Sequence, residues 1–366
     1  MNEKNYPGIS AFQLAAVIII CRVFTLMTHI PLINEGFTLP EQLAAIAASS
    51  LAGALLLIPS AVLYGRYGRC GTAESIMQGC RPAGIISSAV CALYLLFSCI
   101  LDLSAFSDFM NARFPAGVPV KITALIMTAA CIYCAYCGIE GIARGSGTVI
   151  FLFVVMVIFM IGGSADKISL ENIRQGFGIK NTAQAFFEDL SGGTELALLC
   201  LMGKYTAGNF RKGGYFALAG RLICAAGIML SAVLILGDYA YMCSYPFLDM
   251  GSAAGINFLQ RIDSVYMMIW VLTAVLTISL KIYVGAGSAA MLGGKINKSE
   301  KLLPVVIFAA VIYLCAAFSP AEKLLTGVWG QIILCVMLGI ITVIIPLTAM
   351  CSIRKKRKAA GNEKQS

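Results

Sequence analysis

The chain has 366 residues, of which 59% are hydrophobic and only 12% are charged, and its mean hydropathy is +0.85. Soluble domains carry roughly 25% charged residues, so a water-soluble fold of this length could not bury so much apolar surface. The formal net charge of +9 comes from basic residues in short segments between apolar runs and near the C-terminus. That distribution is typical of membrane topology and argues against nucleic-acid binding.

The sequence contains ten apolar runs, most of them close to the ~20 residues that cross a bilayer. They predict an all-α polytopic membrane protein, because in lipid only helices satisfy their backbone hydrogen bonds within one segment. In chain order, the predicted spans are Ile9–Ile30, Leu43–Tyr64, Ala83–Met110, Val118–Cys137, Ile142–Gly162, Ala183–Gly203, Tyr215–Leu236, Val265–Tyr283, Leu303–Phe318 and Thr326–Met350. Residues 1–350 are expected to form one transmembrane domain, followed by a basic cytoplasmic tail at 351–366. No cleavable signal peptide is predicted, so the first run is expected to remain as a span.

The distribution of lysine and arginine predicts that both ends of the chain lie in the cytoplasm. With an even number of spans, 18 basic residues, Arg221 among them, fall on the inner side and 7 on the outer side. Arg22 and Lys281 are left inside spans. In the outer loop at 163–182, residues Leu170–Ile173 are a candidate for a short interfacial helix.

The 14 cysteines do not predict a disulfide framework, because most lie inside apolar runs, where a free cysteine behaves as a small hydrophobic residue. Cys131, Cys134 and Cys137 are spaced like ligands of a metal cluster. No fourth cysteine or histidine is near them, and the chain has a single histidine, His29. We therefore expect no metal and no cofactor.

The sixth predicted span contains the most informative polar interruption, Glu188–Glu195. Two adjacent glycines each cost about 1 kcal/mol in a helix interior. A break would leave main-chain groups facing an enclosed polar chamber that could hold a small zwitterion or ion. A close crossing of two helices is the alternative, since small residues also permit it. The candidate ligand-binding residues here are Ser191, Gly192, Gly193, Thr194 and Glu195.

Polar residues in other spans are candidates for the same site. Arg22 requires a partner, which we expect to be Glu195, Asp102 or a ligand carboxylate, although snorkelling or a purely structural ion pair would also satisfy it. Asp102 is expected to face the bundle interior. No nucleophile with its base and no Walker loop is present, so an enzyme is not expected. The remaining ligand-binding candidates are Thr25, Trp270, Thr273 and Thr277.

The segment Tyr136–Arg144 matches the motif Tyr-x-Gly-Ile-Glu-x-Ile-Ala-Arg, and other matches follow in order at Tyr245-Pro246, Arg261-Ile262-Asp263, Met268-Ile269-Trp270 and Ile278-Ser279-Leu280. On these residues the chain resembles the endospore germination permeases, the B-type membrane subunits of spore germinant receptors, from Ile9 to about Pro346. Glu140 and Arg144 are four residues apart and can pair on one helical face, so we interpret them as structural or gating residues.

The resemblance implies a leucine-transporter-type fold of the amino acid–polyamine–organocation superfamily. Two inverted repeats, at about 9–163 and 183–350, would place unwound spans one and six around a midplane site. The implied function is nutrient sensing, with an amino acid as ligand, beside an A-type membrane subunit and a C-type lipoprotein in the inner membrane of the spore. The alternatives are a secondary transporter of amino acids or polyamines, proton-coupled through Glu195 or Asp102, and a membrane scaffold. Arg22 and Phe24 depart from the family pattern near its usual glycine, which indicates an altered or occluded pocket.

Overall fold

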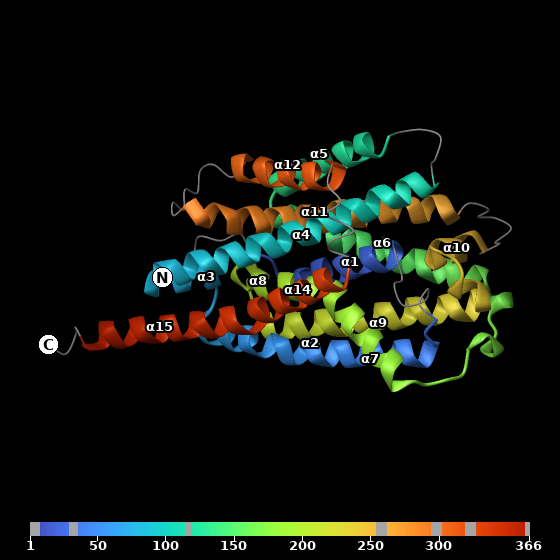
Figure 1. Cartoon of the computed structure of the whole chain (residues 1–366), viewed down its shortest axis with the longest axis horizontal. Helices are drawn as coiled ribbons and strands as arrows, with labels where there is room; N and C mark the ends of the chain where they lie inside the picture. Colours follow the sequence, from blue (N-terminus) through green and yellow to red (C-terminus); the bar gives the residue numbers. More distant parts are fainter. Residues whose placement is uncertain are drawn as a thin grey trace.

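A computed structural model describes residues 8–28, 36–113, 119–253, 262–293, 302–318 and 327–362, and they fold as helices that run roughly along one long axis (Figure 1). The described residues hold no strand beyond one isolated bridge, Ile9 to Thr206. The all-α prediction is therefore confirmed. The helices are α1 (Ala11–Thr28), α2 (Leu39–Tyr67), α3 (Thr72–Gly79), α4 (Arg81–Arg113), α5 (Val120–Tyr136), α6 (Ile139–Gly163), α7 (Ile179–Gly192), α8 (Thr194–Leu201), α9 (Phe210–Leu236), α10 (Pro246–Ala253), α11 (Ile262–Ala290), α12 (Leu302–Phe318), α14 (Val328–Gly339) and α15 (Ile345–Asn362).

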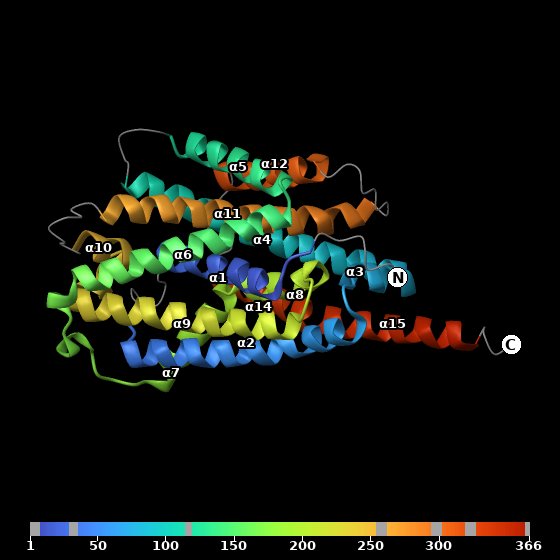
Figure 2. The ribbon, with the colours of Figure 1, turned by 180° about the vertical axis from the view of Figure 1, so that it is seen from behind.

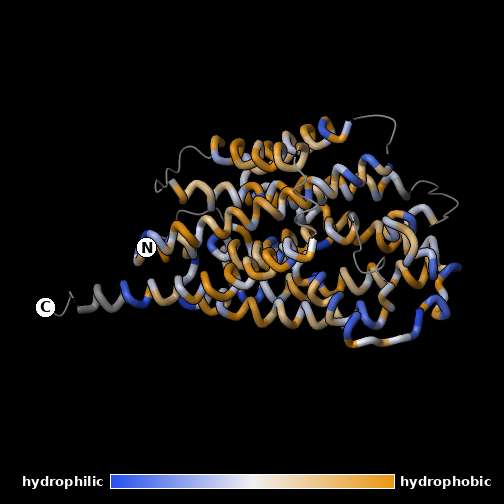
Figure 3. The backbone as a smooth tube through the Cα atoms, in the orientation of Figure 1, coloured by the Kyte–Doolittle hydropathy of each residue, from blue (hydrophilic) through white to orange (hydrophobic). Residues whose placement is uncertain are grey.

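Seven helices in the described part of the chain are long and apolar enough to cross a membrane. The helices α5 and α12 are shorter apolar helices, and α7 and α8 together occupy the place of the predicted sixth span. This arrangement agrees with the ten predicted spans. Apolar residues colour most of the bundle, whereas hydrophilic residues gather at its two ends and in the connections there (Figure 3).

Helix α1 lies at the centre of the bundle and packs against α6, α9 and α11 (Figure 2). It is the most enclosed of the seven long spans, with 72% of its residues buried. The pair α5 and α12 lies on one side of the bundle, and α2 with α7 lies on the opposite side. Polar side chains carried by α1 are therefore surrounded by protein, where they need protein partners.

Helices α4 and α15 are among those that continue further than the apolar pattern predicts. Helix α4 reaches from Arg81 to Arg113, and α15 continues through the basic segment to Asn362. Before α15, residues Ile340–Ile344 form a π-helical turn. The hydroxyl of Ser352 donates to the carbonyl of Ser75 at 2.8 Å, so α15 rests on the short helix α3. Residues 351–362 are thus a helical extension of the last span.

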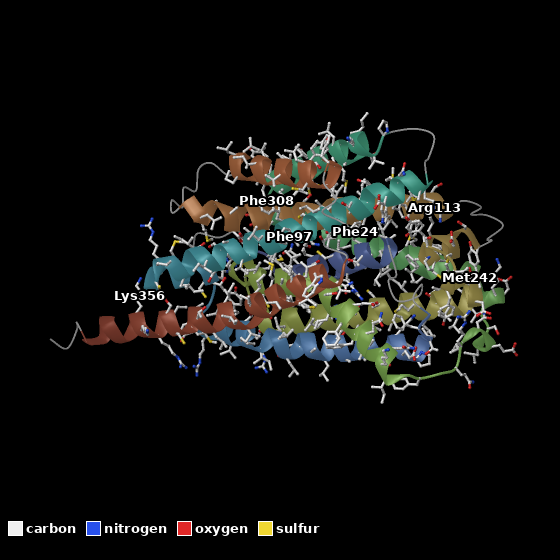
Figure 4. The ribbon with its side chains drawn as sticks, in the orientation of Figure 1. Phe24, Phe97, Arg113, Met242, Phe308 and Lys356 are labelled. Atoms are coloured by element: carbon white, nitrogen blue, oxygen red, sulfur yellow. The ribbon has the colours of Figure 1, made fainter. Side chains whose placement is uncertain are left out.

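One end of the bundle joins several chain segments, and we call it the terminal end. There the amide of Gly8 donates to Glu140 Oε1 at 3.2 Å, and the residues before α1 pair with those after α8. The amide of Ile9 donates to the carbonyl of Tyr205 at 2.9 Å, and that of Ala207 to the carbonyl of Ile9 at 2.7 Å. Figure 4 shows Lys356 toward this end, Arg113 and Met242 toward the opposite end, which we call the distal end, and Phe24 between them.

Candidate functional site at the interrupted span

The sixth span is interrupted at one residue, Gly193, which separates α7 from α8. Its dihedral angles, φ −73° and ψ 53°, are not helical, and its amide donates to the carbonyl of Leu190 at 3.2 Å. A Cβ at this position would lie 3.2 Å from the carbonyl oxygens of Asp189 and Leu190. Glycine therefore suits the close approach of the backbone at this turn. The predicted discontinuity is present.

Four charged side chains from four helices meet around this break. Arg221 of α9 donates from Nε to Glu195 Oε1 at 2.7 Å and from Nη2 to Asp189 Oδ2 at 2.6 Å. Arg22 of α1 donates from Nη2 to Asp189 Oδ1, and its Nη1 lies 3.9 Å from Glu195 Oε1. We call these four residues the ion network. Because Asp189 precedes the break and Glu195 follows it, Arg221 holds α7 and α8 together across Gly193.

The ion network is buried and electrically balanced, with two guanidinium groups and two carboxylates whose side chains are at most 4% exposed. Two hydroxyls of α2 complete it: Ser49 donates to Asp189 Oδ2, and Arg221 Nη1 donates to both Ser49 and Ser50 at 3.3 Å. Among the described residues, the Nε of Arg22 is buried without a hydrogen-bond partner. Removing one member of such a buried set of ion pairs is costly, because it leaves a buried charge without its partner.

A second polar cluster joins α4, α8 and α11 beside the break. The ammonium of Lys281 donates to Ser98 Oγ at 2.6 Å, to Asp102 Oδ2 at 2.6 Å and to Thr194 Oγ1 at 2.9 Å. Thr194 is the first residue of α8, so this cluster fixes the start of the helix that follows the break. Asp102 faces the interior as predicted, but its partner is Lys281 and not Arg22.

Aromatic side chains fill the space toward the distal side of the polar clusters. Trp270 of α11 is fully buried and stacks on Phe106 with ring centroids 4.8 Å apart and an angle of 5°. Phe109 approaches it to 4.2 Å and Phe24 to 6.4 Å. The Trp270 indole N–H donates to Thr28 Oγ1 at 2.8 Å, which ties α11 to α1. Phe24 thus contributes to a packed aromatic layer.

One expectation about the shape of the site is wrong. Helix α1 is continuous from Ala11 to Thr28, although the resemblance implied that span one is unwound. The helix is continuous because Phe24 packs against Trp270 near the position where the family usually has a glycine. His29 and Ile30 lie outside the described residues. The flanking acids Asp189 and Glu195 do not border open space, because both are already paired with arginines.

The partner assignment of Arg22 and the placement of Arg221 also need correction. Arg22 pairs first with Asp189, which was not among its expected partners, and more distantly with Glu195. Arg221 belongs to the buried interior of α9 and not to an inner loop, because its side chain is fully enclosed. A signal was present in the sequence, since Arg221 lies well inside the apolar run Tyr215–Leu236.

Several other candidates make only local contacts. Three of their hydroxyls donate to backbone carbonyls in the same helix. The Thr25 hydroxyl donates to the carbonyl of Cys21 at 3.2 Å. The Ser191 hydroxyl donates to the carbonyl of Glu188 at 3.0 Å, and the Thr273 hydroxyl donates to the carbonyl of Trp270 at 2.7 Å. Back-bonding of this kind is common in membrane helices. Thr277 is buried one turn before Lys281, and Gly192 is exposed. The role of these residues in binding stays a prediction.

Glu140 and Arg144 lie at the surface of the terminal end. Their charged groups are 4.0 Å apart, and both side chains are at least 48% exposed. The predicted pairing is present, but an exposed pair of this kind contributes little to stability. The contact of Glu140 with Gly8 links α6 to the start of the chain. A gating role stays a prediction.

A pocket of about 540 Å³ opens at the terminal end, away from the break. Tyr64 borders it, and the Tyr64 hydroxyl donates to the carbonyl of Cys200 in α8 at 2.9 Å, so the pocket lies next to the end of the interrupted span. The sequence did not predict this pocket. Its lining residues are Tyr64, Gly68, Arg69, Gly203, Thr206, Ala207, Gly208 and Phe210.

The fold and its buried polar interior define a permease-like membrane protein. Residues 74–323 match the family described as spore germination protein, and the chain belongs to that family. Among solved structures, Mhp1, a nucleobase-cation-symport-1 family transporter, is similar in its closed conformation with bromovinylhydantoin bound. The TM-score is 0.66, with 17% identity over 94% of this chain and 80% of Mhp1.

The inward-facing conformation of Mhp1 matches with a TM-score of 0.55, at 17% identity over 93% of this chain and 78% of that chain. No curated protein sequence matches. These similarities establish the leucine-transporter-type fold, and the family and fold are those of a membrane permease.

Proposed function

We propose that this chain is the nutrient-sensing membrane subunit of a spore germinant receptor and that its ligand is an amino acid. The family membership supports a role in germination. The observation that carries the proposal is the ion network, which joins α1, α2, α7, α8 and α9 around an interrupted span. A discontinuous helix surrounded by charges at membrane depth is the usual setting of a binding site in this type of fold.

The ligand acts by competing with the internal ion pairs. The carboxylate of an amino acid can accept from Arg22, whose Nε has no hydrogen-bond partner among the described residues. Such binding would release part of Asp189 and loosen the connection between α1 and α7. A ligand shifts a conformational equilibrium only by its differential affinity for the two states. The closed, ion-paired arrangement is then the unliganded state, and the ligand stabilises a more open one.

The partners that fit this role are an A-type membrane subunit and a C-type lipoprotein, which would read the change in conformation. The chain would lie in the inner membrane of the spore, with its N- and C-termini in the cytoplasm. Neither an inorganic cofactor nor nucleic acid takes part in this proposal.

Secondary transport of an amino acid or a polyamine is the alternative function. The similarity of the fold to a symporter favours it. The two functions differ in what the chain does alone: a transporter moves labelled substrate into liposomes, whereas a sensor binds the ligand without accumulating it. Loss of germination on deletion, without loss of uptake, would support the sensor.

Removal of the arginine that the ligand is expected to contact should abolish the response. We expect Arg22→Met to reduce amino-acid binding at least about tenfold, because it removes a cation that the ligand carboxylate meets. We expect Glu195→Gln to weaken binding, because it removes an anion that the ligand ammonium meets and the partner of Arg221. The measurement is the thermal shift of the purified chain with a panel of amino acids, followed by germination of spores that carry each variant. Arg174→Met, which removes an exposed ion pair with Asp238, is the matched control. Unchanged binding by Arg22→Met would remove Arg22 from the site.

Tryptophan fluorescence can report the opening directly, because the chain has only two tryptophans. Trp329 is 77% exposed, whereas Trp270 is fully buried next to α1. In a Trp329→Phe variant, we expect emission from Trp270 typical of an apolar environment, with a red shift when the ligand opens the bundle. An emission maximum that does not move at saturating ligand would contradict the proposed opening.

A further inference from the structure

The ammonium of Lys281 sits in a cage of oxygen atoms in the interior of the bundle. Three oxygens from two other helices surround it at 2.6–2.9 Å: the hydroxyls of Ser98 and Thr194 and one carboxylate oxygen of Asp102. The side chain of Lys281 is 2% exposed and that of Asp102 is 14% exposed. A carboxylate with hydroxyls is a ligand set of hard oxygen donors, which suits an alkali-metal cation as well as an ammonium.

The charge around the break leaves no place for an additional metal cation while Lys281 is present. The cations are Arg22, Arg221 and Lys281, and the anions are Asp102, Asp189 and Glu195, so the six charges cancel. No group of three or more acidic, cysteine or histidine side chains that could hold a metal ion is found in the described ranges. An extra cation here would be desolvated without a compensating anion, which is costly.

We propose that Lys281 is a built-in cation that occupies a latent alkali-metal site formed by Ser98, Asp102 and Thr194. The ammonium makes the contacts that a bound Na⁺ or K⁺ would otherwise make, and it holds α4, α8 and α11 together at the start of α8. The folded chain accordingly needs no alkali cation, and removal of the ammonium creates a site that takes one. This inference concerns folding and cation binding, and it is independent of the proposed nutrient.

The experiment compares Tm of the purified full chain in NaCl, KCl and N-methylglucamine chloride at equal ionic strength. Wild-type protein is expected to have the same Tm in all three salts. Lys281→Met removes the ammonium, leaves the carboxylate of Asp102 unpaired and lowers Tm. Addition of Na⁺ or K⁺ to that variant should then raise Tm by about 2 °C in a saturable manner, because ligand binding stabilises the folded state by mass action.

The double variant Lys281→Met/Asp102→Asn removes both members of the pair and is expected to fold without dependence on the cation. Lys167→Met, which removes an exposed lysine bonded to the carbonyl of Ala253, is the matched control and should show no effect of the cation. A saturable increase in Tm of the wild type with Na⁺ or K⁺ would overturn the proposal, because it would show that the chain already binds an alkali ion. The absence of any cation effect in folded Lys281→Met would overturn it as well. If Lys281→Met does not fold, the wild type and the double variant are compared with each other. A Tm that rises with Na⁺ or K⁺ in either of them would refute the proposal, and a Tm that does not depend on the cation in both supports it.

Discussion

Replacement of Arg221 by methionine is expected to lower the free energy of unfolding by about 3–5 kcal/mol, the usual effect of removing one partner from a buried ion pair. Arg221 is fully buried and contacts both Asp189 and Glu195. Without it, the only charged partner of Glu195 among the described residues is Arg22 at 3.9 Å, and the connection across Gly193 is lost. Reversible unfolding of the purified chain in mixed micelles, or its thermal denaturation, measures the change.

Two further variants show whether the loss comes from the charge or from the removed volume. Arg221→Met/Glu195→Gln removes one charge of each sign and is expected to recover part of the lost stability. Arg174→Met removes an exposed pair with Asp238 at 2.8 Å, and surface pairs contribute only ~0.2–1 kcal/mol. If Arg221→Met is no less stable than Arg174→Met, the ion network does not hold the interrupted span together.

Truncation of Trp270 to alanine should cost about 3–5 kcal/mol, the range for large aromatic side chains in a core. Its ring is fully buried between Phe106 and Phe109, and its N–H donates to Thr28, so truncation leaves a cavity and removes the hydrogen bond that the Thr28 hydroxyl accepts. The thermal unfolding of the purified protein measures the effect. We also expect faster proteolysis at the distal end.

The second tryptophan supplies the control for this variant. Trp329 of α14 is 77% exposed, so Trp329→Ala removes the same side chain without opening a cavity. Its Tm should stay close to that of the wild type. Equal losses of stability in the two variants would show that the aromatic layer around Trp270 is not the packed core of the distal half.

The spans could be predicted from the sequence because every segment that crosses lipid must be apolar over about 20 residues and must satisfy its own backbone hydrogen bonds. The prediction Leu303–Phe318 differs from α12 by one residue at its start. The short helices α3 and α10 were missed because neither has an apolar run of spanning length. The only local signal for α10 was Pro246, a residue that favours the first turn of a helix. The extension of α15 was missed because a basic segment is compatible with both a helix and an unstructured tail.

The site was predicted in part. Adjacent glycines and flanking acids predicted an interruption within Glu188–Glu195, since these residues weaken a membrane helix wherever it lies, and the break lies at Gly193. The partner of Arg22 could not be chosen in the same way, because Asp189 is 167 residues away and two other carboxylates were equally plausible. Arg221 was placed among the inner basic residues, because the distribution of lysine and arginine near span ends was used only to orient the spans. That distribution does not reveal which face of a helix meets α7 and α8. Pairing of this kind depends on the rotation of each helix in the bundle.

The short pairing of Ile9 with Tyr205 and Ala207 gives the molecule a preferred direction of opening. It fastens the beginning of α1 to the residues that follow α8 through two main-chain hydrogen bonds, so that the first and sixth spans cannot separate at the terminal end without breaking both. At the distal end, the ties include the surface pairs Arg113–Asp249 and Arg174–Asp238, which separate at small cost. A molecule hinged in this way opens at the distal end, which is the outer side in the predicted topology, while the terminal end stays shut.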